Sequence, residues 1–246
     1  YTAKDGIDRI TGDLQKVSDQ VFVVVDIMTD ALNEAYSGDI KTELSDRMSD
    51  ISEFDTENQT EGKTAKCVST GYVEGDINVG GITGSMAIEY DFDREDDITK
   101  NGKKSLNFVL ISRAVVRECE NSGEVVSKKN CVGGIAGRAD LGCIINSTGG
   151  GSIKSKSGDY IGGIAGKSET VIKSCNSRAL LQGDDYIGGI AGEASHIYDC
   201  KSSAYIESGD ECIGAVAGNN TGKCARNSFY DYGIGGIDSI SYAGIA

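Results

Sequence analysis

The chain has 246 residues, with 34 Gly, no Pro and no Trp, and a formal net charge of −14 at pH 7. A disordered low-complexity chain typically brings Pro with its Gly, and 39% hydrophobic residues suffice to build a core, so the Gly indicate repeated structural positions. No basic stripe is present in the sequence to neutralise phosphates, which argues against nucleic acid and anionic membranes as partners.

Residues 1–60 are predicted to form a helical hairpin. Apolar residues at alternating spacings of three and four form a heptad seam over residues 7–35, which predicts one amphipathic helix of about 30 residues. A second apolar stripe from Ile40 to Ile51 predicts a shorter helix with Asp39 as its N-cap. Two roles stay open: a cap on the domain that follows, or a stalk that self-associates through residues 7–35. The polar residues 55–66 predict a linker.

From about residue 67 onward, one short phrase recurs. Its best copies read Val/Ile-Gly-Gly-Ile-Ala-Gly, and the six copies begin at Val79, Val132, Ile161, Ile187, Ile213 and Ile234. Their first Gly lie at positions 80, 133, 162, 188, 214 and 235, so the intervals are 53, 29, 26, 26 and 21 residues. The longest interval indicates an insertion at about 86–112. A unit of about 26 residues rich in Val and Ile fits one turn of a parallel β-helix better than a helical repeat.

Residues 67–246 are therefore predicted to form a parallel β-solenoid of about six rungs, which makes the chain mostly β. The phrase glycines are expected to supply tight corners where φ is positive. These repeat glycines are Gly80, Gly81, Gly84, Gly133, Gly134, Gly137, Gly162, Gly163, Gly166, Gly188, Gly189, Gly192, Gly214 and Gly218.

A column of small residues precedes the phrases at a nearly constant distance of 10 to 14 residues. It predicts an inward structural ladder of Cys67, Cys119, Ser147, Cys175, Cys200 and Cys224. Equivalent positions of neighbouring rungs stack about 4.8 Å apart, so both reduced thiols and bridges between neighbouring rungs fit the spacing. No C-x-x-C pair occurs and the chain has one His, so no zinc site is expected.

A second column stands directly before the phrases, where Cys131 and Cys212 flank Tyr160 and Tyr186 in the two rungs between them. The two cysteines are three rungs apart, roughly 14 Å, which is too far for a disulfide. Tyr160 and Tyr186, with Tyr198 and Tyr205, could form a face on which sugars stack, although Tyr also packs well on sheets.

The phrase resembles the GLUG motif repeat of bacterial cell-surface proteins, which include adhesin-like proteins and immunoglobulin-A-directed metallopeptidases. The resemblance rests on the tetrapeptides that start at Gly81, Gly134, Gly163 and Gly189, and it covers about 70% of the chain, residues 67–240. Copy five departs from it with Ala215 in place of Gly. The resemblance implies a right-handed β-solenoid displayed outside a bacterial cell.

No constellation for catalysis stands out in the sequence, so no catalytic, cofactor-binding or metal-binding residue is assigned and no cofactor is expected. The one His, His196, lacks the positioned partners that a nucleophilic triad needs. Asp91, Asp93, Glu95 and Asp97 alternate as in a calcium loop, but Asp96 and Gly102 stand where an EF-hand requires Gly and Glu.

The expected function is a non-enzymatic surface solenoid that presents an adhesin-like interaction surface to an unknown protein or glycan, or serves as a spacer. The alternative is a polysaccharide-active lyase or hydrolase, because β-helices also carry such enzymes. No apolar run of about 20 residues is present to span a membrane. The chain begins at Tyr1 without Met and ends within a Gly-rich pattern. We therefore expect sequence beyond both ends, in a larger anchored protein at the bacterial cell surface.

Overall fold

The computed structural model describes residues 13, 14, 16–18, 20, 21, 24, 48–87, 110–207, 211–226 and 228–230. The chain divides into two compact units, Tyr1–Met48 and Ser49–Ala246, and each is treated by itself. In the first unit the described residues between 13 and 24 are helical, as the heptad seam predicts. Four seam side chains there are 54–65% exposed, namely Leu14, Val17, Val21 and Val24.

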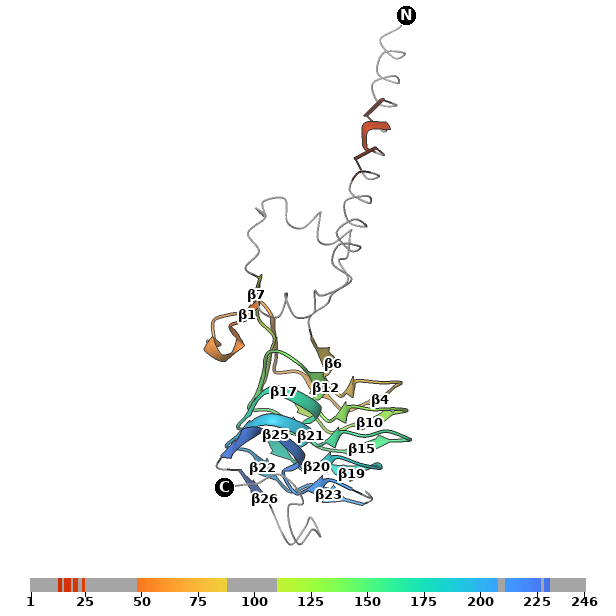
Figure 1. Cartoon of the computed structure of the whole chain (residues 1–246), viewed down its shortest axis with the longest axis vertical. Helices are drawn as coiled ribbons and strands as arrows, with labels where there is room; N and C mark the ends of the chain where they lie inside the picture. Colours follow the sequence, from red (N-terminus) through yellow and green to blue (C-terminus); the bar gives the residue numbers. More distant parts are fainter. Residues whose placement is uncertain are drawn as a thin grey trace, which may run out of the picture. The chain divides into compact units, whose positions relative to one another are not determined.

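The second unit is a β-solenoid of parallel stacked coils, with about four turns in the part of the chain that the structure describes. Figure 1 shows the strands β4, β10, β15, β19 and β23 following one another as one wall of the stack. The coils pair in strict register: Val132 lies between Val79 and Ile161, and Ile187 lies between Ile161 and Ile213. The sequence repeat is therefore the structural repeat.

Four parallel sheets make the walls of the solenoid. The first contains β3 (Val68–Ser69), β9 (Glu120–Asn121), β14 (Thr148–Gly149), β18 (Asn176–Ser177), β22 (Lys201–Ser202) and β26 (Phe229–Tyr230). The second contains β4 (Tyr72–Gly75), β10 (Glu124–Ser127), β15 (Ser152–Ser155), β19 (Leu180–Gln182) and β23 (Tyr205–Ile206). The third holds the start of each phrase: β5 (Val79–Gly80), β11 (Val132–Gly133), β16 (Ile161–Gly162), β20 (Ile187–Gly188) and β24 (Ile213–Gly214).

The fourth sheet follows the phrases and contains β2 (Lys63–Ala65), β6 (Thr83–Met86), β8 (Val115–Arg117), β12 (Ala136–Ala139), β13 (Cys143–Ile145), β17 (Ala165–Lys173), β21 (Ala191–Tyr198) and β25 (Ala217–Arg226). In the later coils one long strand replaces two short ones, since β17 pairs with both β12 and β13. Outside these walls, β1 (Met48–Asp50) pairs with β7 (Leu110–Ser112), and η1 is a 3-10 helix over Ser52–Phe54.

Each phrase contributes to two separate apolar cores. In the first four phrases the first Val or Ile packs in one cluster with residues such as Val125 and Leu181, whereas the fourth residue, for example Ile164, packs in the other with Ile144 and Ile172. The Gly pair lies between these two buried side chains. Because β-branched side chains fill both cores, their burial is the main stabilising contribution, at roughly 1.5–3 kcal/mol for each.

The phrase glycines are not the corners that the sequence suggested. In the described residues, positive φ among glycines occurs only at Gly62, Gly142 and Gly151. The turns use other residues instead, at the position before each phrase and the position before each ladder residue. These have φ of +50° to +66°: Lys66, Asn78, Glu118, Cys131, Asn146, Tyr160, Ser174, Tyr186, Asp199 and Cys212. The phrase needs Gly for a different reason, which is the close approach of backbones.

Gly162 illustrates this close approach and yields a prediction. A Cβ there would overlap the Ala165 carbonyl oxygen and lie 2.8 Å from the Ala191 Cα of the next coil, both of them backbone atoms. Gly162→Ala is therefore expected to cost about 1–3 kcal/mol in the free energy of unfolding, as overpacking does. Gly71→Ala is the control, because its Cβ would meet nothing within 4 Å, and it should stay within about 0.5 kcal/mol of wild type. Equal urea midpoints for the two variants would contradict the crowding argument.

Several expectations about the chain ends need correction. The predicted second helix is wrong at its C-terminal end, because Met48–Asp50 is a strand that pairs with β7, while residues 25–47 lie outside the described ones. Five phrases are stacked, and the sixth, at 234–239, also lies outside the described residues, so six rungs are not shown. Val79 pairs directly with Val132, so the phrases on either side of the predicted insertion are neighbours, whereas residues 88–109 of that insertion lie outside the described residues.

The predicted linker over 55–66 is also wrong. It includes β2, which pairs with β8. Asp55, at its start, has a side chain only 1% exposed, with ion pairs to Lys63 (2.8 Å) and Arg117 (3.1 Å). This segment is therefore part of the first coil. Its polar composition does not show that its charged residues form a buried ionic cluster.

Candidate functional site

The corner before each phrase aligns four side chains from successive coils: Cys131, Tyr160, Tyr186 and Cys212. Their backbones share a left-handed conformation, with φ between +54° and +66°. Each amide of the first three donates to the next coil, for example Tyr160 N to Asp185 O at 3.2 Å and Tyr186 N to Glu211 O at 3.2 Å. The column predicted from the sequence is confirmed by this register.

Tyr160 and Tyr186 stack on each other. Their ring centroids are 4.8 Å apart and their planes differ by 26°. This separation matches the spacing between neighbouring strands, so the solenoid itself sets the stack. Of the other two tyrosines considered for a sugar face, Tyr198 lies on β21 near His196 and Tyr205 on β23, so the structure does not bring all four together.

A polar column runs beside the tyrosines, from the residue that follows each phrase. It contains Arg138, Lys167, Glu193 and Asn219, which are paired in register from coil to coil. Glu193 accepts from Lys167 and Asn219: Lys167 Nζ lies 2.7 Å from Oε1, and Asn219 Nδ2 donates to Oε2 at 2.9 Å. The Lys167 ammonium also lies 5.4 Å from the Tyr160 ring centroid. We call the two columns together the Tyr160–Tyr186 face.

The electrostatics of this face keep its tyrosines neutral. Burial raises the pKa of Tyr160, and the neighbouring Cys212 and Tyr160 raise the pKa of Tyr186. The hydrogen bond with Glu193 raises the pKa of Lys167, which therefore stays charged at neutral pH. The face thus combines neutral aromatic rings with fixed polar groups, an arrangement suited to recognition of a ligand.

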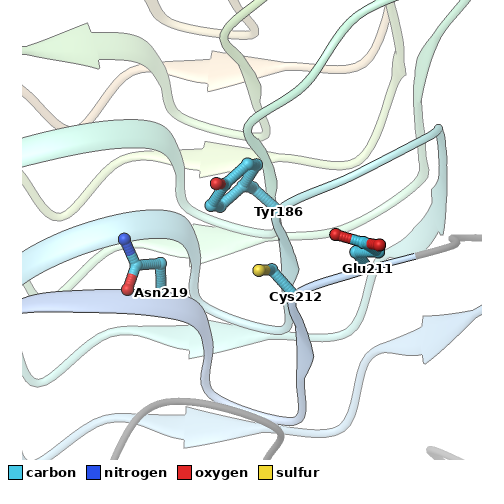
Figure 2. A pocket seen from close by; sticks show the side chains of 4 residues that line it. All are labelled: Tyr186, Glu211, Cys212 and Asn219. Atoms are coloured by element: carbon cyan, nitrogen blue, oxygen red, sulfur yellow. The ribbon is translucent and has the colours of Figure 1, made fainter.

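The face includes a hollow of about 580 Å³, which lies where the tyrosine stack ends. It is lined by Tyr186, Glu211, Cys212 and Asn219. Figure 2 shows Tyr186 and Cys212 on neighbouring coils, with Glu211 on one side of Cys212 and Asn219 on the other. The volume is within the range of about 300–1,000 Å³ that small-molecule sites occupy.

The structural ladder is placed in part as expected. Cys119, Ser147, Cys175 and Cys200 are buried at equivalent positions, and their backbone amides bond along the ladder, as Cys119 N does to Ser147 Oγ at 3.2 Å. Cys67 has the right register but is exposed, because it lies on the first coil.

Cys224 is outside the ladder. It pairs with His196, and Ser228 takes the ladder position instead, with its Oγ accepting from Cys200 N at 3.3 Å. The distance from the preceding phrase gives the reason. Cys224 follows Ile213 by 11 residues, whereas Ser147, Cys175 and Cys200 follow the start of their preceding phrase by 13 to 15, and Ser228 follows Ile213 by 15.

The ladder predicts a graded thiol reactivity. The cysteines whose side chains the structure describes are free thiols, and five of them are buried: Cys119, Cys131, Cys143, Cys175 and Cys200. Burial raises the pKa of Cys143 to about 12 and also raises that of Cys119, Cys131 and Cys175, which keeps them protonated.

In a native labelling experiment at pH 7.5, Cys67 should react in a fast phase and the five buried thiols at least about a hundredfold more slowly, since they wait for local opening. Peptide mass spectrometry identifies each labelled residue, and Cys67→Ser should remove the fast phase at that site. Fast labelling of Cys175 in the folded chain would contradict the buried ladder.

Other sequence candidates contribute no site in the described part of the chain. The acidic segment Asp91–Asp97 lies outside it. Among the described residues, no three His, Cys, Asp or Glu side chains gather as metal ligands would. No helix of this part is long and apolar enough to cross a membrane. His196 lies in β21 with its Nδ1 2.9 Å from Ser195 Oγ.

The polar column was missed in the sequence, although a signal was present. Each of Arg138, Lys167, Glu193 and Asn219 directly follows the last Gly of a phrase, so aligning the copies one residue further would have shown a charged or amide position. Lys167 and Glu193 carry opposite charges on neighbouring coils, which stabilises a stacked pair, whereas Arg138 and Lys167 carry like charges.

Comparison with known proteins gives one structural similarity. No protein-family model matches the chain, and no curated protein matches it. A crystal structure from Bacteroides ovatus, named "putative immunoglobulin A1 protease", is similar at a TM-score of 0.43 and 20% sequence identity. The match covers 71% of this chain and 51% of that chain, so this chain spans about half the length of that protein.

Proposed function

We propose that this chain is a non-enzymatic solenoid segment of a bacterial cell-surface protein, and that it presents an adhesin-like interaction surface to a protein or glycan. The observation that carries the proposal is the Tyr160–Tyr186 face, where stacked rings lie beside the polar column. Tyrosine offers a large amphipathic contact area at low entropic cost, which suits recognition surfaces. The resemblance of the phrases to GLUG repeats supports a location of the protein outside the cell.

The polar groups of the face are arranged for binding rather than for proton transfer. Glu193, at 8% exposed, is held by both Lys167 and Asn219, and Arg138 lies 2.6 Å from Asp140. A general acid or base needs access to the substrate proton and a pKa near the working pH. A carboxylate held between an ammonium and an amide instead acts as a fixed support for its neighbours.

The finer architecture belongs to the same proposal. We take the coil to be right-handed, with the phrase at 234–239 adding a further rung. The seam of residues 7–35 is proposed to self-associate, because Leu14, Val17, Val21 and Val24 are 54–65% exposed. A stalk of this kind would bring several solenoids together and strengthen weak single contacts by avidity.

The experiment uses the full chain, biotinylated at its N-terminus and loaded on streptavidin beads. Retention is measured on an array of immobilised glycans and on extracellular glycoproteins before and after deglycosylation, with albumin as the blank. The proposal expects retention above the blank on at least one class, with no change in the retained substrate. Retention on none of them, or fragments of a glycan or protein that accumulate with time in mass spectra, would overturn it in favour of a spacer or an enzyme.

A further inference from the structure

The tyrosine stack ends abruptly at one coil. Tyr160 lies against one face of the Tyr186 ring at a centroid distance of 4.8 Å. The next residue in the same corner column is Cys212, whose side chain is far smaller than a tyrosine. The hollow of about 580 Å³ lies here, lined by Tyr186 and Cys212 together with Glu211 and Asn219 (Figure 2). It is a slot at the position that a third ring of the stack would occupy.

The backbone of the slot and its Asn219 side chain are held in place before any ligand arrives. The backbone at its base is fixed by the ladder bonds Tyr186 N to Glu211 O and Ile187 N to Cys212 O, both 3.2 Å. The Glu211 amide also donates to Asp185 Oδ1 at 2.9 Å. On the opposite side, Asn219 is oriented by its hydrogen bond to the nearly buried Glu193. A preorganised slot loses little entropy on binding.

We propose that this slot binds a saccharide ring, which stacks its C–H face on Tyr186 while its hydroxyls bond to Glu211 and Asn219. This inference rests on the proposed function and names the ligand class of that face. A pyranose is flat enough to enter a stack, and its rim of hydroxyls donates to a carboxylate and exchanges bonds with an amide. The neutral phenol ring of Tyr186 offers it an apolar surface with a polar tip.

The column itself supplies the sharpest variant. Tyr already occupies the same corner in two neighbouring coils, with φ of +65° at Tyr160 and +54° at Tyr186 against +54° at Cys212, so Cys212→Tyr should complete the stack without disturbing the fold and fill the slot. Cys212→Ser is the matched control, because it replaces the same side chain and leaves the slot open. Tyr186→Ala removes the stacking surface, and Tyr205→Ala removes a tyrosine that is 49% exposed on β23 of another sheet.

The full chain and these four variants are titrated by calorimetry with the glycan that the array retains best, and thermal melts confirm that each is folded. Cys212→Tyr and Tyr186→Ala are expected to weaken the affinity at least tenfold, whereas Cys212→Ser and Tyr205→Ala should keep it within about twofold. Glycan binding that Cys212→Tyr leaves unchanged would overturn the slot and leave the proposed function standing. The slot proposal would also be overturned if the wild-type chain bound only protein. Binding of a phenolic or quaternary ammonium probe instead of sugar would overturn it as well. Absence of retention on both the glycan array and the glycoproteins would instead refute the proposed function itself.

Discussion

Ile164→Asp should unfold several coils of the solenoid at once. Ile164 is fully buried in the core that the fourth phrase residues share, and its backbone bonds to both neighbouring coils, through Ile135 N to Ile164 O and Ile164 N to Ile190 O. An Asp there would place a carboxylate among Ile and Val side chains without a partner. We expect a loss of more than about 4 kcal/mol in the free energy of unfolding, which is at the extreme of single substitutions.

Two controls separate the buried charge from other effects of this change. Ile164→Val removes one methylene and should cost about 0.5–1.5 kcal/mol. Leu180→Asp introduces the same carboxylate on β19, where the side chain is 37% exposed, and should cost far less than Ile164→Asp. Urea unfolding followed by far-ultraviolet circular dichroism measures all three variants. A midpoint for Ile164→Asp within 0.3 M of that for Leu180→Asp would show that the coil does not depend on this core.

The repeat could be predicted from the sequence because stacking imposes one residue type on each column. Spacing alone predicts a column of Val and Ile at the phrase start and a column with Tyr160 and Tyr186 before it, and the register confirms both. The reason is physical: neighbouring coils are about 4.8 Å apart, so equivalent positions share one environment. A phrase that recurs about every 26 residues therefore predicts that its copies lie next to one another in the stack.

The local backbone could not be predicted so directly. Gly has two uses, positive φ and close approach, and a pattern of Gly does not distinguish between them. In the phrase the second use applies, as the overlap of a Gly162 Cβ with Ala165 shows, and positive φ falls on Tyr186 and Cys212. The slot of the candidate site depends on the backbone conformation at these corners. The sequence therefore indicates the tyrosines of the site but not the hollow beside them.

The first coil could not be predicted from the sequence for a further reason: residues that form ion pairs show no periodic pattern. Residues 55–66 are polar, and polar composition without periodicity is typical of a linker. Contacts with distant residues place this segment in the fold, namely the pairing of β2 with β8 and the contact between Asp55 and Arg117, 62 positions apart. Which residues meet across such a sequence separation depends on the order in which the coils stack. The predicted insertion between Asp55 and Arg117 obscures that order in the sequence.

Asp55 provides the second strong prediction. Its side chain is 1% exposed and that of Lys63 is 7% exposed, and their charged atoms lie 2.8 Å apart. Arg117, with a side chain 19% exposed, completes the cluster at 3.1 Å. Asp55→Asn keeps the shape but leaves the ammonium of Lys63 buried without its counter-charge. Breaking a buried pair in this way costs about 3–5 kcal/mol at neutral pH. Asp76→Asn, which breaks a 2.7 Å pair with Lys128 whose side chains are more than half exposed, should cost less than about 1 kcal/mol.

The effect of Asp55→Asn should also depend on pH, in a direction that the structure fixes. Burial raises the pKa of Asp55, but the hydrogen bonds from Lys63 and Arg117 outweigh it, so the pKa in the folded chain is below its usual value of 3.8. The stability that the carboxylate contributes is therefore fully present well above pH 3.8, and it is lost as the pH falls through the lower folded value. Urea unfolding of wild type and Asp55→Asn at pH 6.5 and at stepwise lower pH should show a difference in stability that is constant down to about pH 5 and then shrinks as Asp55 takes up its proton. A difference that stays constant to pH 2.5 would mean that the carboxylate charge does not stabilise the first coil.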